Sequence, residues 1–585
     1  MSLKRELLIG TALFAGVSIV GGIAVAQNSA ALRGYSPNEG SVPGVGIPKH
    51  NPPFPQTSPL PDIAPLASSA TGSVFPTTLD GLVGSIKPTA DADVAGMWTG
   101  LAKWPVVAIH ANLLPNGHVL TYGTPSTSTD QNSQDFDDWD PAQGLAEPSH
   151  TVTSNQTSIN SFCSASKLIA NELLLVTGGN SANSTGVWNE SRRQFSAVTT
   201  APLQYPRWYA SIVRLPDNRV LAVGGSDPYH GAAYVSPYDN TNLSLTPEIF
   251  TASGGWSILP GATSAEAFGA LDNRFWYPRA YVAPNGSVFG ISNSYLWSMS
   301  TAGNGAITPV GYLATTGGGT GGGAAATSVM YDIGKILLAG GGQRSNEEQV
   351  PASRQATVID INRVGSNGVV APASNDTSPM TYGRHWGTAV ALPTGKVLVV
   401  GGTAYANSGA NAVYAGEIWD PATGKWTTTA PAAAARLYHS TATLLLNGAV
   451  LNAGGGAGDT DSNSYFNAQV YFPPYLFTRS NGSVVWATRP TVTAVSALPA
   501  YGAAVDLTMA DKSRIASVSL ISLAAVTHSQ STDQRRIPLA FQQANTKLKI
   551  TYPTSRAVLP PGYYQLHIVD SAGVPSTGAV IEIKV

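Results

Sequence analysis

Five residues capable of metal or redox chemistry share one position in a repeated segment of the chain. Each stands eleven residues before the centre of an apolar β-run, and the five are Cys163, Tyr209, Tyr277, Trp386 and His439. Imidazole suits copper and phenolate oxygen suits an oxidised metal. Equivalent positions of successive repeats form a ring about one axis, so these side chains should meet although 276 residues separate Cys163 from His439. The other two repeats have Ala108 and Ala325 at this position, and these small side chains leave the ring open.

The element that positions this ring is a turn, a Val/Leu/Ile run and small residues, often a Gly pair. Seven copies begin 46 to 68 residues apart, at Asn116, Glu172, Asn218, Gly286, Gly334, Gly395 and Gly448. A glycine-marked, strand-rich repeat of about 40–50 residues is typical of a kelch-type blade, with longer spacings as loop insertions. We therefore expect an all-β chain in which residues 96–488 form a seven-bladed kelch-type β-propeller. An irregular all-β sandwich would not explain seven similar units.

The two ends differ from this repeat. Residues 489–585 show alternating strands without Gly pairs, which predicts an immunoglobulin-like β-sandwich. Lys4 and Arg5 precede the apolar run Leu7–Ala26, so residues 1–26 are predicted to be an export signal peptide. If uncleaved, this run of about 20 residues is long enough to anchor the chain in a membrane. Eleven prolines between Pro37 and Pro88 predict an extended linker over residues 27–95. The working domains are then secreted, periplasmic or at the cell surface.

Composition excludes several classes of protein. The chain has 585 residues, with 32 Lys+Arg against 34 Asp+Glu, and only 11% of its residues are charged. No basic excess supports nucleic-acid binding, and the low charge with 12 Trp, 23 Tyr and 14 Phe argues against disorder. One Cys permits neither an internal disulfide nor a Cys-rich zinc site. We expect a monomer with a small-molecule substrate, and a membrane as partner only through an uncleaved N-terminus.

Four motifs, in the same order along residues 96–585, carry a family resemblance. They are Phe162-Cys163 leading into Gly178-Gly179, Arg207-Trp208-Tyr209 leading into Gly224-Gly225-Ser226, Arg436-Leu437-Tyr438-His439-Ser440 leading into Gly454-Gly455-Gly456, and Val526-Thr527-His528 with Thr532–Leu539. Together they resemble the galactose oxidase and glyoxal oxidase family of copper radical oxidases.

The resemblance implies one copper ion per chain, held by Tyr209, Tyr438, His439 and His528. Cys163 would be joined to Tyr209 by a thioether bond, and that tyrosine would carry a radical. Tyr438 would be the axial ligand and the general base, because a hydroxyl bound to copper becomes acidic. One electron would come from copper and one from the radical, so that an alcohol or aldehyde is oxidised and O₂ becomes H₂O₂.

The sequence departs from galactose oxidase in its expected pocket. There, a Trp after Gly-Gly-Ser shields the cross-linked tyrosine, whereas Asp227 follows here. Replacement shields are Trp208, Trp276, Tyr277 and Tyr229, with Trp276 and Tyr277 favoured by the ring position. Thr403 stands where a sugar-binding Gln would be expected, and Arg279 is only a candidate for the pocket. A glyoxal-type aldehyde or another primary alcohol is therefore as plausible a substrate as galactose.

Each of these residues could also have a purely structural role. A single Cys is most often a small buried hydrophobe, and an isolated Tyr usually packs with its hydroxyl hydrogen-bonded. His230 and His385 fall on no family motif, and Trp386 is pocket wall or plain packing. Two other functions remain open: a non-catalytic propeller that binds carbohydrate or a cell surface, and a propeller hydrolase. The second would need paired carboxylates near the axis, and no ring position carries one.

Overall fold

The computed structural model describes residues 82, 86–125, 131, 135–199, 202–228, 239–313, 322–456, 464–497 and 499–585. All of them belong to one compact unit, Ser36–Val585. The expected signal peptide, most of the expected linker, Tyr229 and His230 lie outside the described residues.

The described strands before residue 474 form seven groups: six of four strands, each ordered as it runs along the chain, and a last group of five strands. The first three are β3 (His110–Leu113), β4 (Val119–Gly123), β5 (Asp135–Trp139) and β6 (His150–Ser154); β7 (Ser164–Leu168), β8 (Leu173–Gly178), β9 (Thr185–Asn189) and β10 (Gln194–Ala197); and β11 (Ser211–Arg214), β12 (Val220–Val223), β13 (Glu248–Thr251) and β14 (Gly255–Ile258). Neighbouring strands within each group are antiparallel.

The other four groups follow the same plan. They are β15 (Arg279–Val282), β16 (Val288–Ser292), β17 (Tyr295–Ser300) and β18 (Ala306–Tyr312); β19 (Ala326–Asp332), β20 (Lys335–Gly340), β21 (Ala356–Asp360) and β22 (Ala373–Asp376); β23 (Thr388–Ala391), β24 (Val397–Val400), β25 (Ala415–Asp420) and β26 (Lys425–Pro431); and β27 (Ser440–Leu444), β28 (Val450–Gly454) and β29 (Asn467–Phe472). The last group is completed from the other end of the described chain, by β1 (Met97–Trp98), with β2 (Ala102–Lys103) also on β29.

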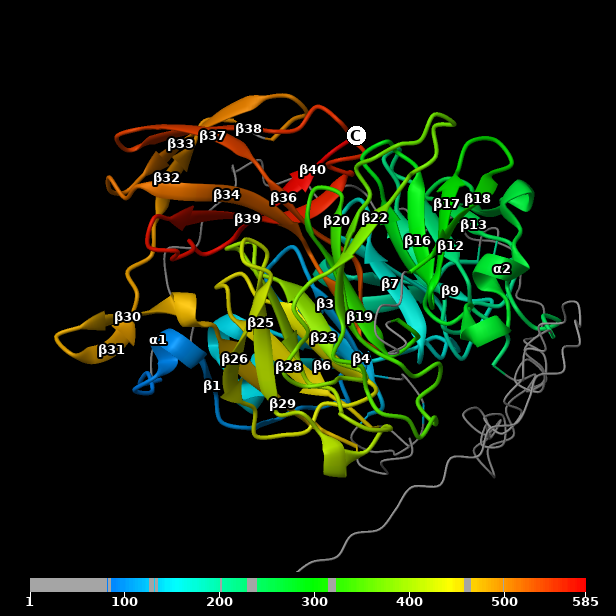
Figure 1. Ribbon diagram of the computed structural model, residues 1–585, viewed down its shortest axis with the longest axis horizontal. Coiled ribbons are helices and arrows are strands. Elements are labelled where there is room, and N and C mark those ends of the chain that lie inside the picture. Colours follow the sequence, from blue (N-terminus) through cyan, green and yellow to red (C-terminus); the bar gives the residue numbers. More distant parts are fainter. Residues whose placement is uncertain are drawn as a thin grey trace, which may run out of the picture. The chain divides into compact units, whose positions relative to one another are not determined.

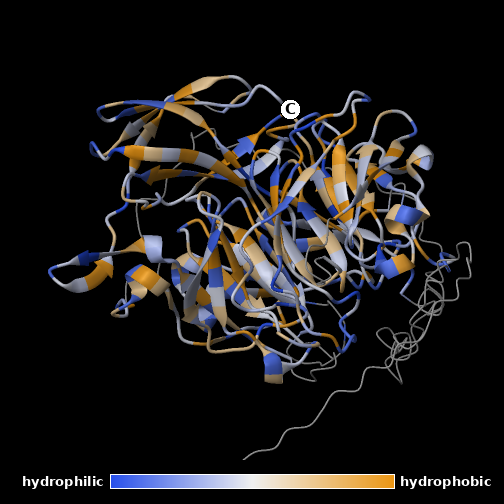
Figure 2. Cartoon of the chain, viewed as in Figure 1, coloured by the Kyte–Doolittle hydropathy of each residue, from blue (hydrophilic) through white to orange (hydrophobic). Residues whose placement is uncertain are grey.

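The apolar runs found in the sequence become the second strand of each group. β8 and β12 are buried along their whole length, because both of their faces pack against neighbouring groups. Gly117 (φ +90°) turns the chain after Asn116 in the β3–β4 hairpin, a conformation that glycine adopts without a steric penalty. In Figure 2, hydrophobic residues in orange recur along the strands, interspersed with paler and blue residues.

The Gly pairs have a packing role between neighbouring groups. Gly224 and Gly225 both have positive φ, and a Cβ on Gly224 would stand 2.6 Å from the carbonyl oxygen of Phe275, just before β15. The same relation joins Gly401 to Arg436, at 2.9 Å. In the last group a Cβ on Gly454 would stand 2.5 Å from the carbonyl oxygen of Ala108, just before β3. The glycines therefore permit close backbone contact between one group and the next, and between the last group and the first.

The C-terminal strands form two sheets around a separate apolar core. One sheet holds β32 (Val492–Val495), β33 (Ala504–Met509), β37 (Ala540–Ala544) and β38 (Lys547–Thr551); the other holds β34 (Ile515–Ser522), β36 (Gln530–Pro538), β39 (Gly562–Asp570) and β40 (Ala579–Ile583). Leu507 and Leu548 from the first sheet share that core with Leu520 and Ile568 from the second. Figure 1 shows β34 and β39 side by side, in agreement with their pairing.

One hairpin of this C-terminal segment enters the preceding groups. β35 (Ala525–Thr527) pairs with β3, and β36 pairs with β19, which joins the first and fifth groups into a 13-stranded sheet. β36 also contacts the first strands β11, β15 and β23, while β35 contacts β7 and β27. The tight turn between β35 and β36, at residues 528 and 529, is therefore held among the first strands of many groups.

The all-β expectation is confirmed, because strands dominate and the helices of the described residues are short, such as α1 (Ala92–Ala95) and α2 (Ala265–Phe268). None of the helices among the described residues is long and apolar enough to cross a membrane. The described end of the expected linker packs against the folded strands. Leu82 is buried in the core, Asp93 pairs with Arg479 in the hairpin of β30 (Phe477–Ser480) and β31 (Ser483–Trp486), and Ile86 accepts a hydrogen bond from Trp486. Residues that their proline content assigned to a linker therefore pack against the folded strands.

Candidate metal centre

The ring residues lie immediately before the first strand of each group and touch through their backbones. The amide of Tyr209 donates to the carbonyl of Cys163, and the amide of Tyr277 donates to that of Tyr209. Trp386 donates likewise to Ala325. Cys163, Tyr209, Tyr277 and Trp386 belong to one buried apolar cluster, which also contains Tyr438 and Trp208, and the ring of His439 lies 3.9 Å from that of Tyr438. The structure therefore brings together the side chains that the repeat spacing places in a ring.

These positions share a strained backbone. Cys163, Tyr209, Tyr277, Trp386 and His439 all have positive φ, between +41° and +69°. Non-glycine residues rarely adopt this conformation, and it costs about 1–3 kcal/mol at each position, so the surrounding packing must hold it. Such strain concentrates at functional sites, where it directs a side chain to a defined place.

Two phenols and two imidazoles converge at this cluster. The hydroxyl groups of Tyr209 and Tyr438 are in direct hydrogen-bond contact. The ring of His528 lies 5.2 Å from each tyrosine ring and 4.7 Å from the ring of His439. All four side chains are almost completely buried. The cluster thus presents two oxygen and two nitrogen donors to one place.

His439 is oriented as a metal ligand would be. Its Nδ1 donates to the carbonyl oxygen of Gly456 at 2.5 Å, so the lone pair is on Nε2. That Nε2 is buried and makes no hydrogen bond within the described structure. Burial lowers the pKa of His439 to about 3, which keeps the imidazole neutral. A neutral ring whose other nitrogen is held by a carbonyl is the usual state of a metal-bound histidine.

The C-terminal hairpin delivers His528 beside Cys163. Nε2 of His528 is 3.5 Å from Sγ of Cys163, and Nδ1 is 2.6 Å from Oγ1 of Thr527. Ligand atoms of Cys163, His439 and His528 all lie within 4.8 Å of one another. Burial, and then the neighbouring His439 and His110, hold the pKa of His528 well below its usual value.

Indole rings surround the two tyrosines. Trp276 stacks on Tyr209 with ring centres 4.4 Å apart, and Trp208 does so at 3.7 Å. Tyr277 is tilted, 5.2 Å away, and its hydroxyl donates to the carbonyl of Ser164. Trp386 packs edge-on against Tyr438 at 4.7 Å. Asp227 has no aromatic ring with which to cover Tyr209. Trp276, from the segment before the next strand group, and Trp208 stack on Tyr209 instead.

Other candidates lie away from the cluster. The guanidinium of Arg279 donates to the carbonyls of Ala324 and Ala326, so this side chain is committed to the backbone between the fourth and fifth groups. Nε2 of His385 is 3.1 Å from the carbonyl of Val350. Thr403 donates to backbone carbonyls of its own loop, including that of Tyr405 at 3.1 Å. The structure does not bring these three side chains to the four donors.

Sequence reasoning missed residues that hold the cluster in place. Gly456 and Thr527 contact the two imidazoles, and Gln343 accepts the indole N–H of Trp386 at 2.8 Å. His110 is fully buried, stacks on Tyr122 at 4.2 Å, and neither of its ring nitrogens makes a hydrogen bond within the described structure. His110 is two residues past Ala108, so the repeat spacing skipped it. Gly456 and Thr527 had a visible signal, since both stand in the motifs Gly454-Gly455-Gly456 and Val526-Thr527-His528.

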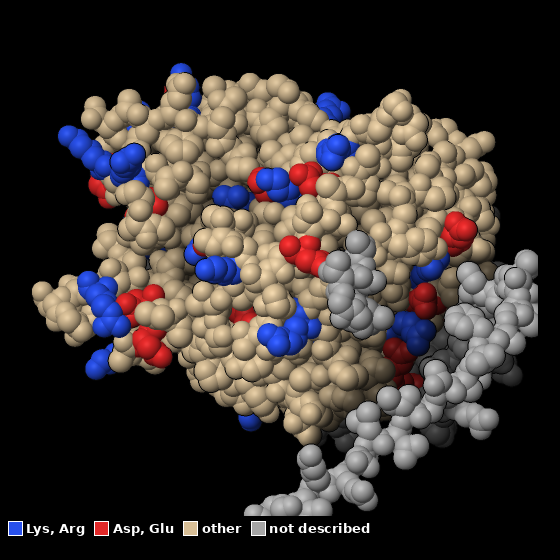
Figure 3. All heavy atoms as spheres, viewed as in Figure 1, with Lys and Arg blue, Asp and Glu red and all other residues tan. Residues whose placement is uncertain are grey.

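A second group of possible metal-binding side chains lies apart from the cluster. His118, Asp138 and Glu190 approach one another, but each already has protein partners. Asp138 contacts His118 at 2.9 Å and Arg193 at 3.2 Å, and Glu190 accepts from Trp188 at 2.9 Å. These residues form an ion-pair network. Figure 3 shows charged side chains as scattered small groups on the visible face, without a broad basic patch.

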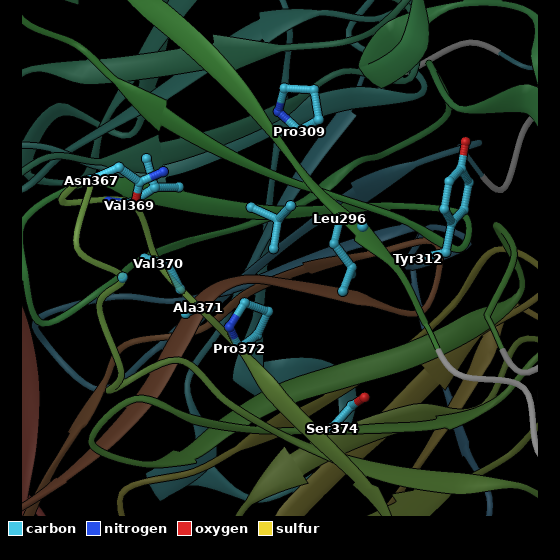
Figure 4. A pocket seen from close by; sticks show the side chains of 12 residues that line it. Leu296, Pro309, Tyr312, Asn367, Val369, Val370, Ala371, Pro372 and Ser374 are labelled. Carbon is cyan, nitrogen blue, oxygen red and sulfur yellow. Dashed lines mark hydrogen bonds between the residues drawn. The ribbon is translucent and has the colours of Figure 1, made fainter.

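A cavity of about 390 Å³ lies away from the ring, between β17–β18 and residues 365–374. Figure 4 shows Leu296, Tyr312 and Val370 among its lining side chains. None of the residues predicted for the site lines this cavity.

The donor set of the cluster fits copper. Two imidazoles and two phenols match the preference of copper for nitrogen and oxygen ligands. The buried Nε2 of His439, which lacks a protein partner within the described structure, is an atom that a metal would satisfy.

Comparison with known proteins agrees with this chemistry. A family model described as "Glyoxal oxidase N-terminus" matches residues 118–477, and one described as "Galactose oxidase-like, Early set domain" matches residues 489–583. The galactose oxidase of Gibberella zeae is 30% identical over 521 residues, which cover 85% of this chain and 72% of that protein. An aldehyde oxidase of Vitis pseudoreticulata is 25% identical, over 72% of this chain and 82% of that protein.

The solved structures include a similar fold. A fungal alcohol oxidase of the AA5 family, determined in complex with copper, superposes with a TM-score of 0.71. The superposition covers 84% of this chain and all of that chain, at 26% identity.

Proposed function

The chain belongs to the glyoxal oxidase family, and from that membership we propose that Tyr209, Tyr438, His439 and His528 hold one copper ion and that a thioether bond joins Cys163 to Tyr209. The chain is a copper radical oxidase of primary alcohols or aldehydes, with O₂ as the second substrate. A primary alcohol and O₂ give an aldehyde and H₂O₂; an aldehyde, water and O₂ give a carboxylic acid and H₂O₂.

The observation that carries this proposal is the convergence of four metal donors beside the chain's one cysteine. When bound, copper supplies a Lewis-acidic position for the substrate oxygen and accepts one of the two electrons. Tyr209, linked to Cys163, accepts the other electron. Tyr438 takes the hydroxyl proton onto its phenolate oxygen. The carbonyl of Gly456 and the hydroxyl of Thr527 keep the two imidazoles aimed at the donor cluster.

Apolar walls favour small substrates. Trp276, Trp208 and Trp386 surround the two tyrosines, so the pocket offers mainly aromatic surface. Nη2 of Arg279 and the hydroxyl of Thr403 bond backbone carbonyls, and neither side chain is among the contacts of the two tyrosines. We therefore expect small aldehydes and simple primary alcohols to be better substrates than galactose.

The propeller also belongs to this proposal. Seven successive strand groups, the Gly-pair contacts between them and the contact of Gly454 with Ala108 support a closed ring of seven blades over residues 96–488. Residues 489–585 are an immunoglobulin-like sandwich that reaches into the ring with His528. The basic residues Lys4 and Arg5 and the apolar run Leu7–Ala26 support export, and residues 27–95, whose end packs on the folded strands, would connect this segment to the propeller. The proposed exported protein is a monomer.

The test combines copper content with peroxide production. Purified protein should hold one copper per chain and release H₂O₂ with members of a panel of simple primary alcohols, glyoxal-type aldehydes and galactose. His528→Ala should lose copper affinity about 10- to 100-fold or more, since one of two imidazoles is gone. His385→Ala removes another buried histidine, away from the cluster, and should keep its copper.

Two results would count against this assignment. Unchanged copper stoichiometry and affinity in His528→Ala would remove that residue from the metal site. A protein without copper and without peroxide release would favour a non-catalytic propeller that binds carbohydrate or a cell surface.

A further inference from the structure

Three of the strand groups contain a buried arginine in the same place. Arg207, Arg384 and Arg436 each lie in the segment before the first strand, and each donates through Nη1 to the first glycine of its own Gly pair. The acceptors are the carbonyls of Gly224, Gly401 and Gly454, at 2.7, 2.7 and 2.9 Å.

In two of these groups a buried glutamate pairs with the arginine. Glu248 on β13 contacts Arg207 at 2.9 Å and accepts the amides of Gln204 and Tyr205. Glu417 on β25 contacts Arg384 at 2.9 Å and accepts the amide of Thr381. The strand register is the same in both, because each glutamate lies opposite the residue two before the first glycine.

In the last group a neutral residue takes this position. Gln469 on β29 lies opposite Asn452, again two residues before the first glycine, Gly454. Its amide oxygen accepts the amide of Ala433, as the glutamates accept backbone amides, and its nitrogen donates to Thr99. Gln469 thus keeps the backbone role of the glutamates but lacks their charge.

Arg436 is therefore a buried cation without a counter-charge in the described structure. Its Nη2 makes no hydrogen bond there, although the side chain is almost completely buried. A buried cation without its carboxylate partner ordinarily destabilises a fold, so Gln469 in place of a glutamate is expected to cost stability.

The Arg436 cation lies next to the donor cluster along the chain. Arg436 is two residues before Tyr438, and one glycine segment connects the two sites. The carbonyl of Gly454 accepts a hydrogen bond from Nη1 of Arg436, and the carbonyl of Gly456 accepts one from Nδ1 of His439. The amide of Gly456 also donates to the carbonyl of Tyr438. The cation and two of the proposed ligands thus share a short, buried stretch of backbone.

We propose that Arg436, which faces Gln469 instead of the glutamate that pairs with Arg207 and Arg384, is a positioning and tuning residue whose charge raises the one-electron reduction potential of the Tyr209–copper centre. Reduction adds an electron to the centre, and a nearby cation in a buried setting favours the added negative charge. Gln469 is then the residue that preserves the effect, because a glutamate there would cancel the cation as Glu248 and Glu417 do in their own groups. This inference rests on the proposed function.

The experiment adds the missing carboxylate. Gln469→Glu, Gln469→Met and the parent protein are loaded with copper, and a redox titration followed by the optical and electron-spin signals of the tyrosyl radical gives each midpoint potential. The melting temperature of each metal-free protein is measured in parallel. We expect Gln469→Glu to shift the potential downward and to keep or raise the melting temperature. Gln469→Met, which loses the hydrogen bonds but adds no charge, should lower the melting temperature and keep the parent potential.

A second variant removes the positive charge itself. Arg436→Met removes the cation and should shift the potential in the same direction as Gln469→Glu. If it fails to fold, the glutamate variant still decides the question. A parent-like potential in folded, copper-loaded Gln469→Glu overturns the inference, as does an equal shift in Gln469→Met. A parent protein that takes up no copper and shows no radical couple would overturn the proposed function itself, and this inference with it.

Discussion

Cys163 is the residue at which metal binding and redox chemistry can be separated. Its sulfur lies 3.5 Å from Nε2 of His528, and its carbonyl accepts the amide of Tyr209. The four proposed copper donors do not include this sulfur. The thioether bond would therefore affect the radical on Tyr209 without being needed to hold the metal.

Replacing Cys163 with alanine should retain copper and lose turnover about 10- to 100-fold or more, as changes beside a metal centre often do. Copper content and H₂O₂ release measure the two effects separately. In the parent protein, thioether formation removes two hydrogens, so the intact mass of copper- and O₂-treated protein should fall by about 2 Da, and thiol reagents should no longer react. A titratable thiol in mature, copper-loaded protein would contradict the thioether assignment.

Trp276 stacks on the ring of Tyr209 with ring centres 4.4 Å apart. Trp276→Phe keeps an aromatic ring but removes the indole, and should shorten the life of the tyrosyl radical by up to about tenfold, since an aromatic pair is worth about 0.5–1.5 kcal/mol. Decay of the radical spectrum measures this. Trp386→Phe is the matched control, because Trp386 packs on Tyr438. Equal radical lifetimes in Trp276→Phe and the parent would assign the shielding to Trp208.

Between the elements, buried Arg–Glu pairs tie the segment before a first strand to the third strand of the same group. Glu248 is fully buried and accepts two backbone amides as well as the guanidinium of Arg207. Loss of this charge leaves Arg207 buried without compensation, in a group whose first strand follows Tyr209 directly.

Glu248→Gln should lower the free energy of unfolding by about 3–5 kcal/mol, the usual cost of breaking a buried pair. Chemical denaturation of the metal-free protein measures the change. Asp217→Asn, which alters the exposed Asp217–Arg219 pair, should change stability by about 1 kcal/mol or less. A Glu248→Gln protein as stable as the Asp217→Asn control would show that the hydrogen bonds of Glu248, and not its charge, stabilise the group.

At the scale of the whole molecule, buried neutral histidines should make the fold sensitive to acid. His567 lies in the C-terminal sheets, away from the donor cluster, and burial lowers its pKa to about 3. An unfolded chain protonates this ring near pH 6.5, so the unfolded state binds the additional proton below that pH. Stability is therefore complete above about pH 6.5 and falls as the pH drops toward 3.

The slope from one such histidine is about 1.4 kcal/mol per pH unit between the two pKa values. Denaturation of the metal-free parent and of His567→Gln, from pH 7 to pH 4, tests this. The variant should be less stable at pH 7 but should lose stability less steeply with acid. Parallel curves for the two proteins would exclude His567 as a source of acid sensitivity.

The amino-acid sequence alone determined the repeat, the all-β class and the identity of the clustered residues. Turn, apolar run and Gly pair recur because every group must make the same hairpin and the same close contact with its neighbour. Their spacing placed Cys163, Tyr209 and His439 in equivalent positions, and the structure joins Cys163 and Tyr209 by a backbone hydrogen bond. Local pattern could predict these features because each depends on the repeat period.

Tertiary structure alone decided which partners each of those side chains has. The stacking of Trp276 on Tyr209, the turn of Arg279 toward Ala324, and the packing of residues 86–95 all depend on contacts between segments far apart in the chain. His110 is buried near His528 because β35 pairs with β3, a contact across more than 400 residues. The direction of a side chain and the approach of a distant strand follow from packing of the whole core, and no local repeat in the sequence encodes them.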